Sequence, residues 1–392
     1  MGLLTPRIRV YAAAALAALA PAAWAETITV NALDDRPDAN LTDGICDADL
    51  SAPGLQSTLR AAVQHANVTL GADTIVVPAG VYRLTIRGGT EQIGATGDLD
   101  LSEDVAIQGA GAATTIIDCK KARDRAFDVL PGVTASISGL SIVKGATPND
   151  ESGGAIRNRG FVTVTDCVLS KCKALDDAGG FDIQEGTGVL TRVWIDRCTS
   201  KDDGGGIDVD GGTLTLDSCT ISRCKAKSEG GGLEDSGQVV TLVNCTISGN
   251  TAKLDAGGIS LEDGGTMTLT NCTVAFNKAK VGAGISVTDE QFGANTCTVA
   301  NSIFASNKKA NSDRVLTSQG GNVDSGNTCG FDHPNANPLL VKLAMNGGSV
   351  PTHTLRATSP ALALGLANCP ATDSRGVARS VPCDSGAFEL VP

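Results

Sequence analysis

Residues 203–232 read DGGGIDVDGGTLTLDSCTISRCKAKSEGGG and contain one full copy of the repeat that decides the fold. The Gly205-Gly206 pair returns as Gly231-Gly232 after 26 residues, and equivalent pairs recur at this interval between residues 153 and 284. A strict period of this length indicates one supersecondary unit stacked on copies of itself, because a single unit cannot bury its own apolar face.

Short runs between the glycines alternate apolar residues with threonine, as in Leu214-Thr215-Leu216 and Met267-Thr268-Leu269. This alternation is typical of β-strands, and none of the runs has helical spacing. Connections between parallel strands are right-handed in nearly all proteins. The sequence therefore predicts an all-β fold, a right-handed parallel β-helix (a solenoid) with about 26 residues per turn.

The first 25 residues are predicted to be a signal peptide. Arg7 and Arg9 precede an apolar run, and Ala23-Trp24-Ala25 matches the small-residue cleavage pattern. The apolar run is too short to span a membrane, and no later segment is long enough. We therefore expect a secreted protein, extracellular or periplasmic, without a membrane span after cleavage.

Composition limits the partners and the disulfides. The chain has 31 Lys and Arg against 43 Asp and Glu, and this net charge of −12 argues against nucleic acid and anionic membranes as partners. It is compatible with calcium or with cationic partners. Thirteen cysteines in an exported chain suggest disulfides, and the odd number leaves at least one thiol unpaired. Cys369 and Cys383 bracket a loop near the C-terminus and are the best candidates for a bridge.

The pattern divides the chain into four parts, in which a rung is one turn of the β-helix. Residues 1–25 are the signal peptide, 26–118 an N-terminal cap with the first rungs, 119–310 the β-helix repeats, and 311–392 a C-terminal cap. Within the N-terminal cap, residues 57–67 are predicted to form a short amphipathic helix, with the serine at the first position as its N-cap.

Both ends of the chain carry family resemblances. Asp43-Gly44-Ile45-Cys46, residues 58–67 (TLRAAVQHAN) and residues 71–82 (GADTIVVPAGVY) together resemble the CSLREA domain, which opens many secreted bacterial β-helix proteins. Pro351-Thr352-His353 and residues 383–389 (CDSGAFE) resemble the choice-of-anchor Q domain. The resemblance implies a secreted bacterial β-helix protein, and these families have no common activity to carry over.

Two departures from these families are informative. Members with a long loop after the first cysteine usually carry a second cysteine where this chain has Ser57, so Cys46 is expected to lack a partner. Members also usually continue beyond the Gly-Ala-Phe-Glu segment into a surface anchor, whereas this sequence stops at Pro392. We therefore expect an unanchored, released protein.

Equal offsets from the glycine pairs place cysteines above one another. Cys167, Cys219 and Cys245 are expected to face inward as small apolar side chains. Cys198 and Cys224 occupy a turn position that later rungs fill with asparagine, which indicates side chains stacked as in an asparagine ladder. The rung spacing permits a disulfide between Cys198 and Cys224, and stacked free thiols are the alternative.

An acidic residue stands two residues before each glycine pair. We call this set the first acidic column: Glu151, Asp177, Asp203, Glu229 and Asp255. Lys201, Lys227 and Lys253 lie two residues before three of these acids. We expect a compensated ionic edge, which discourages association between strands.

A second acidic column lies two residues after the glycine pairs and consists of Asp182, Asp208 and Glu234. These side chains are expected to point outward, where carboxylates one rung apart repel each other unless a cation joins them or their pKa values rise. Carboxylate oxygens suit calcium. The calcium candidates are Asp182, Asp203, Asp208, Asp210 and Glu234, and solvated surface acids are the alternative.

One stretch resembles an enzyme family. Residues 193–209 (VWIDRCTSKDDGGGIDV) look like the Trp-Ile-Asp-His and Asp-Gly-Leu-Ile-Asp stretches of pectate lyases. That resemblance implies calcium ligands at Asp203 and Asp208, and a nearby arginine that removes the C5 proton of a uronate. Arg197 stands where the motif has histidine, and the same stretch also fits the repeat as an ordinary strand. The catalytic candidates are therefore Asp208, Glu234 and Arg197, for a lyase or a glycoside hydrolase.

The leading interpretation is a secreted, unanchored β-helix with a binding or structural role, whose partner is a polysaccharide or a component of the cell surface. A calcium-assisted polysaccharide lyase or another carbohydrate-active enzyme is the first alternative. A repeat adhesin that binds a protein is the second. We expect a monomer, with calcium as the candidate cofactor.

Overall fold

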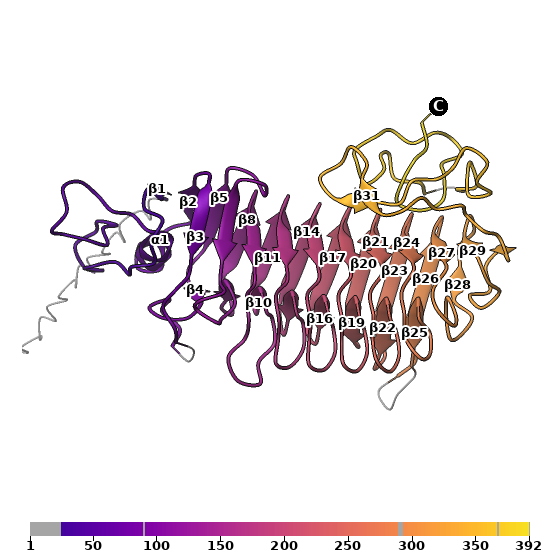
Figure 1. Cartoon of the computed structure of the whole chain (residues 1–392), viewed down its shortest axis with the longest axis horizontal. Coiled ribbons are helices and arrows are strands. Elements are labelled where there is room, and N and C mark those ends of the chain that lie inside the picture. The colour runs from indigo at the N-terminus through magenta and orange to yellow at the C-terminus, as the bar shows by residue number, and fades with distance from the viewer. Residues whose placement is uncertain (1–24, 89–90, 289–292, 367, 392) are drawn as a thin grey trace, which may run out of the picture.

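The computed structural model describes residues 25–88, 91–288, 293–366 and 368–391. The predicted signal peptide therefore lies outside the described residues, except for Ala25. Figure 1 shows an elongated stack of rungs, with a loop-rich C-terminal segment lying along one side of the stack. No helix among the described residues is both long and apolar enough to cross a membrane.

Three parallel sheets run along the stack in the described part of the chain. Sheet A contains, in pairing order, β1 (Thr27–Thr29), β2 (Asp73–Val77), β5 (Val105–Gly109), β8 (Thr134–Ser138), β11 (Phe161–Thr165), β14 (Thr187–Thr191), β17 (Thr213–Asp217), β20 (Val239–Val243), β23 (Thr266–Thr270), β26 (Thr296–Ala300) and β28 (Thr317–Ser318). Sheet B contains β3 (Gly80–Arg83), β6 (Thr115–Asp118), β9 (Ser141–Val143), β12 (Val168–Ser170), β15 (Trp194–Asp196), β18 (Thr220–Ser222), β21 (Thr246–Ser248), β24 (Thr273–Ala275), β27 (Ile303–Ala305), β29 (Val323–Asp324) and β30 (His333–Pro334). Sheet C contains β4 (Leu99–Leu101), β7 (Phe127–Val129), β10 (Ile156–Asn158), β13 (Phe181–Ile183), β16 (Ile207–Val209), β19 (Leu233–Ser236), β22 (Ile259–Glu262) and β25 (Ile285–Val287).

Consecutive rungs stack in register. Leu190 pairs with Leu216, Leu216 pairs with Leu242, and all three side chains are fully buried between the sheets. The alternating threonines of the same strands face away from this core, because successive strand residues point to opposite faces. The predicted parallel β-helix is confirmed.

Close approach between rungs requires the glycine pairs. A Cβ atom on Gly205 would lie 2.5 Å from the carbonyl oxygen of Gly231, and one on Gly206 would lie 2.5 Å from that of Gly232. Any side chain at these positions would push neighbouring rungs apart, so only glycine permits the observed spacing. The period of the sequence is therefore the interval at which the backbones of neighbouring rungs come into close contact.

The cap helix forms one residue later than predicted. Helix α1 spans Leu59–Ala66, and its N-cap is Thr58, whose Oγ1 accepts a hydrogen bond from the Ala61 N–H at 3.0 Å. The prediction of Ser57 as N-cap is wrong, because the Ser57 hydroxyl instead donates to the carbonyl oxygen of Cys46 at 2.9 Å. All eight helical residues are buried, and Arg60 pairs with Asp35 at 2.8 Å beneath the helix.

The turn after sheet B carries the predicted stack of polar side chains. Asn250 donates to Asn277 at 3.2 Å, and Asn277 donates to Asn307 at 3.0 Å, each from Nδ2 to Oδ1. This asparagine ladder is confirmed. Cys198 and Cys224 continue it as buried free thiols, so the disulfide considered between them is not formed and the alternative of stacked thiols holds.

The chain after β30 folds back onto the stack (Figure 1) and includes the antiparallel pair β31 (Ala344–Met345) and β32 (Pro351–Thr352). Thr220 donates to the carbonyl oxygen of Pro351 at 2.7 Å. The ring of His353 lies 2.8 Å from the Ser248 hydroxyl, and its other nitrogen lies 2.7 Å from a backbone carbonyl. Both side chains are buried, so this serine–histidine pair is a docking contact rather than an accessible nucleophile.

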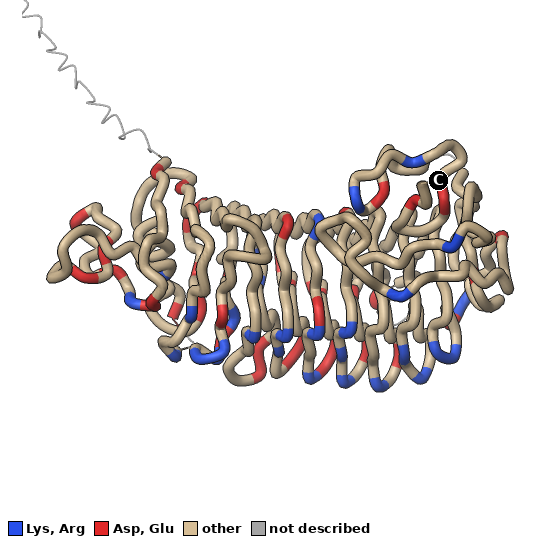
Figure 2. Tube along the Cα trace, turned by 45° about the horizontal axis from the view of Figure 1, so that its top comes forward, with Lys and Arg blue, Asp and Glu red and all other residues tan. Residues whose placement is uncertain are grey.

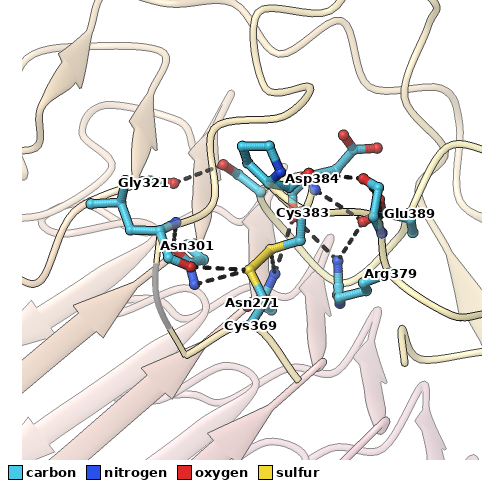
Figure 3. The surroundings of a disulfide bond; sticks show 12 residues. Asn271, Asn301, Gly321, Cys369, Arg379, Cys383, Asp384 and Glu389 are labelled. Atoms are coloured by element: carbon cyan, nitrogen blue, oxygen red, sulfur yellow. Dashed lines mark hydrogen bonds and ion pairs between the residues drawn. A yellow bond between two sulfur atoms is a disulfide. The ribbon is translucent and has the colours of Figure 1, made fainter. Parts of the chain in front are cut away.

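A disulfide joins Cys369 to Cys383 within this C-terminal segment (Figure 3). Asn271, which lies between β23 and β24, donates to the Cys383 sulfur at 3.4 Å. Asn301 donates to the Cys369 sulfur at 3.7 Å. The bridge therefore sits directly on the turn between sheets A and B and ties the C-terminal loops to the stack.

Candidate functional site

The outer face of sheet C carries a continuous column of charged side chains. Asp128 pairs with Arg157, Arg157 with Asp182 and Asp182 with Asp208 in successive rungs, and Glu234 follows in β19. These residues alternate with core residues of the same strands, so they point away from the apolar interior. The second acidic column is therefore one part of a longer charged column.

The acids of this column are buried, although they face outward. Asp182, Asp208 and Glu234 are 0%, 1% and 4% exposed. The loop that leads into each strand folds over the column, and a Cβ atom on Gly204 would lie 2.7 Å from that of Asp208. The alternative of solvated surface acids is wrong for these three residues, because the loop backbone covers them.

At the N-terminal end of sheet C, arginines neutralise the column. Arg125 donates to Asp98 at 2.9 Å, and Arg157 and Arg159 donate to Asp128 at 2.5 and 2.7 Å. Burial would raise the pKa of Asp128, but the hydrogen bonds and charges of these arginines outweigh burial and leave its pKa below the ordinary value. Oxygens of Asp98, Asp100 and Asp128 lie within 4.8 Å of one another beside a pocket of about 190 Å³.

The central rungs bring four carboxylates together without such arginines. Oxygens of Asp177, Asp208 and Asp210 lie within 4.8 Å of one another, and Asp182 is their close electrostatic neighbour. Asp177 comes from the loop before β13, Asp208 lies within β16, and Asp210 directly follows β16. Among the described residues, none of these four acids forms an ion pair with Lys, Arg or His within 4.0 Å. We call this set the central acidic cluster.

Buried oxygens in and beside the central acidic cluster lack hydrogen-bond donors. Both carboxylate oxygens of Asp182, Oδ2 of Asp208 and Oε2 of Glu234 are buried with no partner in the described structure. A buried carboxylate without a partner is costly in its charged form, so it must take up a proton or a cation. The cluster is therefore built to hold positive charge.

Proton uptake by these groups follows from the same geometry. Burial raises the pKa of Asp182 and Asp208 well above the ordinary value, and the charges of Asp210 and Glu234, respectively, raise it further. Burial also raises the pKa of Glu234 to about 8 and that of Asp177 to about 7. The negative charge of Glu234 acts on Asp208, so one proton on either carboxylate relieves part of their repulsion.

The comparisons with known proteins identify the family. The family model of the right-handed β-helix region matches residues 133–332. The chain belongs to the right-handed β-helix family. This match covers the rungs that build the central acidic cluster, and it agrees with the predicted handedness.

The solved structures that resemble this β-helix protein differ widely from it in sequence. Pectate lyase Pel9A is 14% identical, with a TM-score of 0.47 over 94% of this chain and 98% of its own. ORF18 of Geobacillus virus E2 is also 14% identical, with a TM-score of 0.45 over 79% of this chain and 59% of its own. The PL6 family alginate lyase AlyGC is 9% identical, with a TM-score of 0.25 over 86% and 58%. These likenesses concern the fold alone, and no curated protein sequence matches the chain.

The β-helix separates the residues that the pectate lyase resemblance would bring together. Arg197 pairs with Asp196 at 2.8 Å at the end of β15, in sheet B. Asp208 lies in sheet C, and no contact in the described structure joins it to Arg197. Asp203 uses its Oδ1 to accept the Glu229 N–H at 2.6 Å and lies near Glu234 rather than in the central acidic cluster.

The β-helix also corrects the expected ionic edge. Lys201, Lys227 and Lys253 form no ion pair with the first acidic column among the described residues. Asp177 and Asp203 accept loop N–H groups at 2.8 and 2.6 Å, and Glu151 pairs with Arg125 and Arg157, so these acids bond to backbone or to arginine rather than to lysine. Asp177 is therefore a member of the cluster that the sequence did not reveal. Its position in the 26-residue register was visible, but the direction of its side chain was not.

Proposed function

We propose that this protein is an exported calcium-binding β-helix that holds Ca²⁺ between two rungs of sheet C. Asp177, Asp208 and Asp210 are the proposed ligands, with Asp182 as a further carboxylate behind them. The observation that carries the proposal is the approach of the Asp177, Asp208 and Asp210 oxygens to within 4.8 Å of one another, beside buried oxygens of Asp182 and Asp208 that lack a hydrogen-bond donor. A divalent cation would supply the missing positive charge.

The donor set favours calcium over other metals. All four groups are carboxylates, and hard oxygen donors at flexible geometry suit Ca²⁺. Zinc and copper prefer imidazole and thiolate ligands, and no histidine or cysteine belongs to the described cluster. Mg²⁺ requires near-ideal octahedral geometry, whereas Ca²⁺ accepts carboxylates in a more variable arrangement.

The charge distribution supports binding rather than catalysis as the role of the site. A lyase needs a basic side chain that is free to remove a proton. Arg125 and Arg157 act electrostatically on Asp182, and both are already bound to carboxylates of Asp98, Asp128 and Glu151. The predicted signal peptide and the resemblance to CSLREA and choice-of-anchor Q domains support export, to a compartment where calcium is abundant.

Calorimetric titration of the purified chain with CaCl₂ tests the proposal directly. We expect saturable binding by the wild type, weaker or absent binding by Asp208→Asn and by Asp210→Asn, and unchanged binding by Asp217→Asn. Asp217 is a matched control because it is an exposed acid on sheet A. The absence of any calcium heat and of any calcium-dependent rise in melting temperature for the wild type would overturn the proposal.

The lyase alternative is tested with the same protein. Polygalacturonate and other uronate polymers are incubated with the wild type in calcium and in chelator, and the absorbance of unsaturated uronate is followed. We expect no product in either condition. If the wild type forms a calcium-dependent product and Asp208→Asn does not, the metal site stands and its role is catalysis rather than binding.

A further inference from the structure

A groove of about 710 Å³ runs along the edge of the stack between sheets B and C. Two rows of lysines line it, and we call it the lysine groove. The first row contains Lys173, Lys225 and Lys278, and the second contains Lys201, Lys227 and Lys253. Figure 2 shows basic residues recurring from rung to rung along this edge.

Each row is one position of the repeat. In the first row, Lys173, Thr199, Lys225, Thr251 and Lys278 form a continuous series of bridges between neighbouring rungs, so threonine separates the lysines. In the second row, lysine occupies three consecutive rungs, which are about 4.8 Å apart in any such ladder. The groove therefore presents regularly spaced positive charges parallel to the helix axis.

These lysines have no ion-pair partners within the described chain. All six lysines are exposed, none of them forms an ion pair within 4.0 Å among the described residues, and no acidic side chain lines the groove. The acids of the same loops bond to backbone instead, as Asp203 does with the Glu229 N–H. Like charges at this spacing repel one another, so an anionic occupant would be favourable.

The floor of the groove is made of small side chains. Ala174, Ser200 and Ala226 are buried there, and the aliphatic stems of the lysines form its walls. None of the lining residues is aromatic or arginine. Single-stranded nucleic acid is bound chiefly by stacking on aromatic rings, and a protein of net charge −12 repels the dense charge of a duplex.

We infer that the lysine groove binds a linear carboxylated polysaccharide lying along the helix axis. Each ring of an extended 1,4-linked chain advances by a distance close to the rung spacing and is rotated relative to its neighbour, so its carboxylates turn to different sides and can meet the two lysine rows in turn. Small floor residues leave room for the rings. The inference uses none of the proposed calcium ligands and holds whether or not the central acidic cluster binds a metal.

The test is binding of a polygalacturonate decamer to the whole mature chain in EDTA, measured by calorimetry at low salt. Chelator removes binding through bridging calcium, so failure of the calcium site cannot affect the result. We expect Lys201→Gln/Lys227→Gln/Lys253→Gln to weaken binding about tenfold, since each exposed ion pair contributes modestly. The variant Lys173→Gln/Lys225→Gln/Lys278→Gln should weaken it similarly, which guards against misfolding of one variant.

The control is Lys120→Gln/Lys121→Gln/Lys342→Gln, which removes three exposed charges outside the groove. We expect its affinity to stay within about twofold of the wild type, and binding to weaken as salt rises. An equal loss of affinity in the control and the groove variants would overturn the inference, because net charge alone would then explain the binding. No binding by the wild type, or tighter binding of an oligothymidylate of equal charge, would also overturn it.

Discussion

Replacement of Glu234 by glutamine should change how the stability of this β-helix depends on pH. Glu234 is 4% exposed, and burial raises its pKa from the ordinary 4.5 to about 8. Between these two pH values the folded chain holds a proton that the unfolded chain has lost. Stability therefore falls as pH rises through this window, because the folded state binds more protons than the unfolded state.

The magnitude follows from the pKa difference. Each unit of pKa difference corresponds to about 1.4 kcal/mol, so a change from 4.5 to about 8 amounts to at most about 5 kcal/mol. Glu234→Gln keeps the shape of the side chain and a hydrogen-bonding group, but it cannot ionise. In chelator, we expect the wild type to lose up to this amount of unfolding free energy between pH 4.5 and 8, relative to the variant.

The assay is urea unfolding of wild type and Glu234→Gln at several pH values from 4.5 to 8 in EDTA. Other buried acids titrate in the same range, including Asp100 with a pKa raised to about 8 by burial, so only the difference between the two proteins isolates Glu234. Glu185→Gln, at an exposed position after β13, is the matched control and should follow the wild type. If the difference stays below about 1 kcal/mol over the whole range, Glu234 ionises near its ordinary pKa and the reasoning from burial is wrong.

Calcium should stabilise the folded protein more at pH 8 than at pH 5. A ligand that binds only the folded state raises the unfolding free energy by about 2.7 kcal/mol when its free concentration is one hundred times the Kd. The gain should shrink towards pH 5, because protons compete for the same carboxylates. A calcium effect equally large at pH 5 and pH 8 would place the cation elsewhere on the molecule.

Three further predictions concern the fold itself. Cys369→Ser/Cys383→Ser opens a loop with a sequence separation of 14 and should cost about 3 kcal/mol, read as faster amide exchange in the C-terminal segment; unchanged exchange there would contradict it. Asn277→Ala removes the central amide of the ladder, so the buried amides of Asn250 and Asn307 each lose a hydrogen-bond partner. Urea unfolding should show a loss of about 1–3 kcal/mol in unfolding free energy, against little change for the exposed Asn337→Ala. Gly206→Ala places a Cβ atom against the carbonyl oxygen of Gly232 and should destabilise the protein by about 3 kcal/mol, and a variant as stable as the wild type would show that the rungs can separate at this point.

The fold could be predicted because its determinants are local and periodic. Alternation in residues 213–217 defines a strand face, and the recurrence of Gly205 defines where rungs touch. The same periodicity identified which residues stack, including Asp182 on Asp208. Strand β4 (Leu99–Leu101) went unnoticed, because it is short and lies outside the strict period.

The candidate site could be predicted only in part, because register does not reveal what covers a residue. Asp208 was placed in the right column, but the sequence does not show that its own loop folds back over it at Gly204. Asp177 has the spacing of an exposed edge, yet its oxygen lies with those of Asp208 and Asp210. Arg197 has the spacing of a catalytic neighbour, yet the turn before the loop places it beside Asp196 in sheet B.

One structural device accounts for both proposed sites. Three of the loops between sheets B and C carry a lysine and an acid two residues apart, and pairing them would have been the simplest route to a neutral edge. Instead, the lysines stay exposed along the groove, whereas the acids bond to loop backbone or lie beside the buried column of sheet C. The groove lysines and the central acidic cluster form no ion pairs among the described residues, and an anion at the first and a cation at the second would relieve the repulsion within each. The two sites share no side chain, so the effects of substitutions at the two sites should add with little coupling.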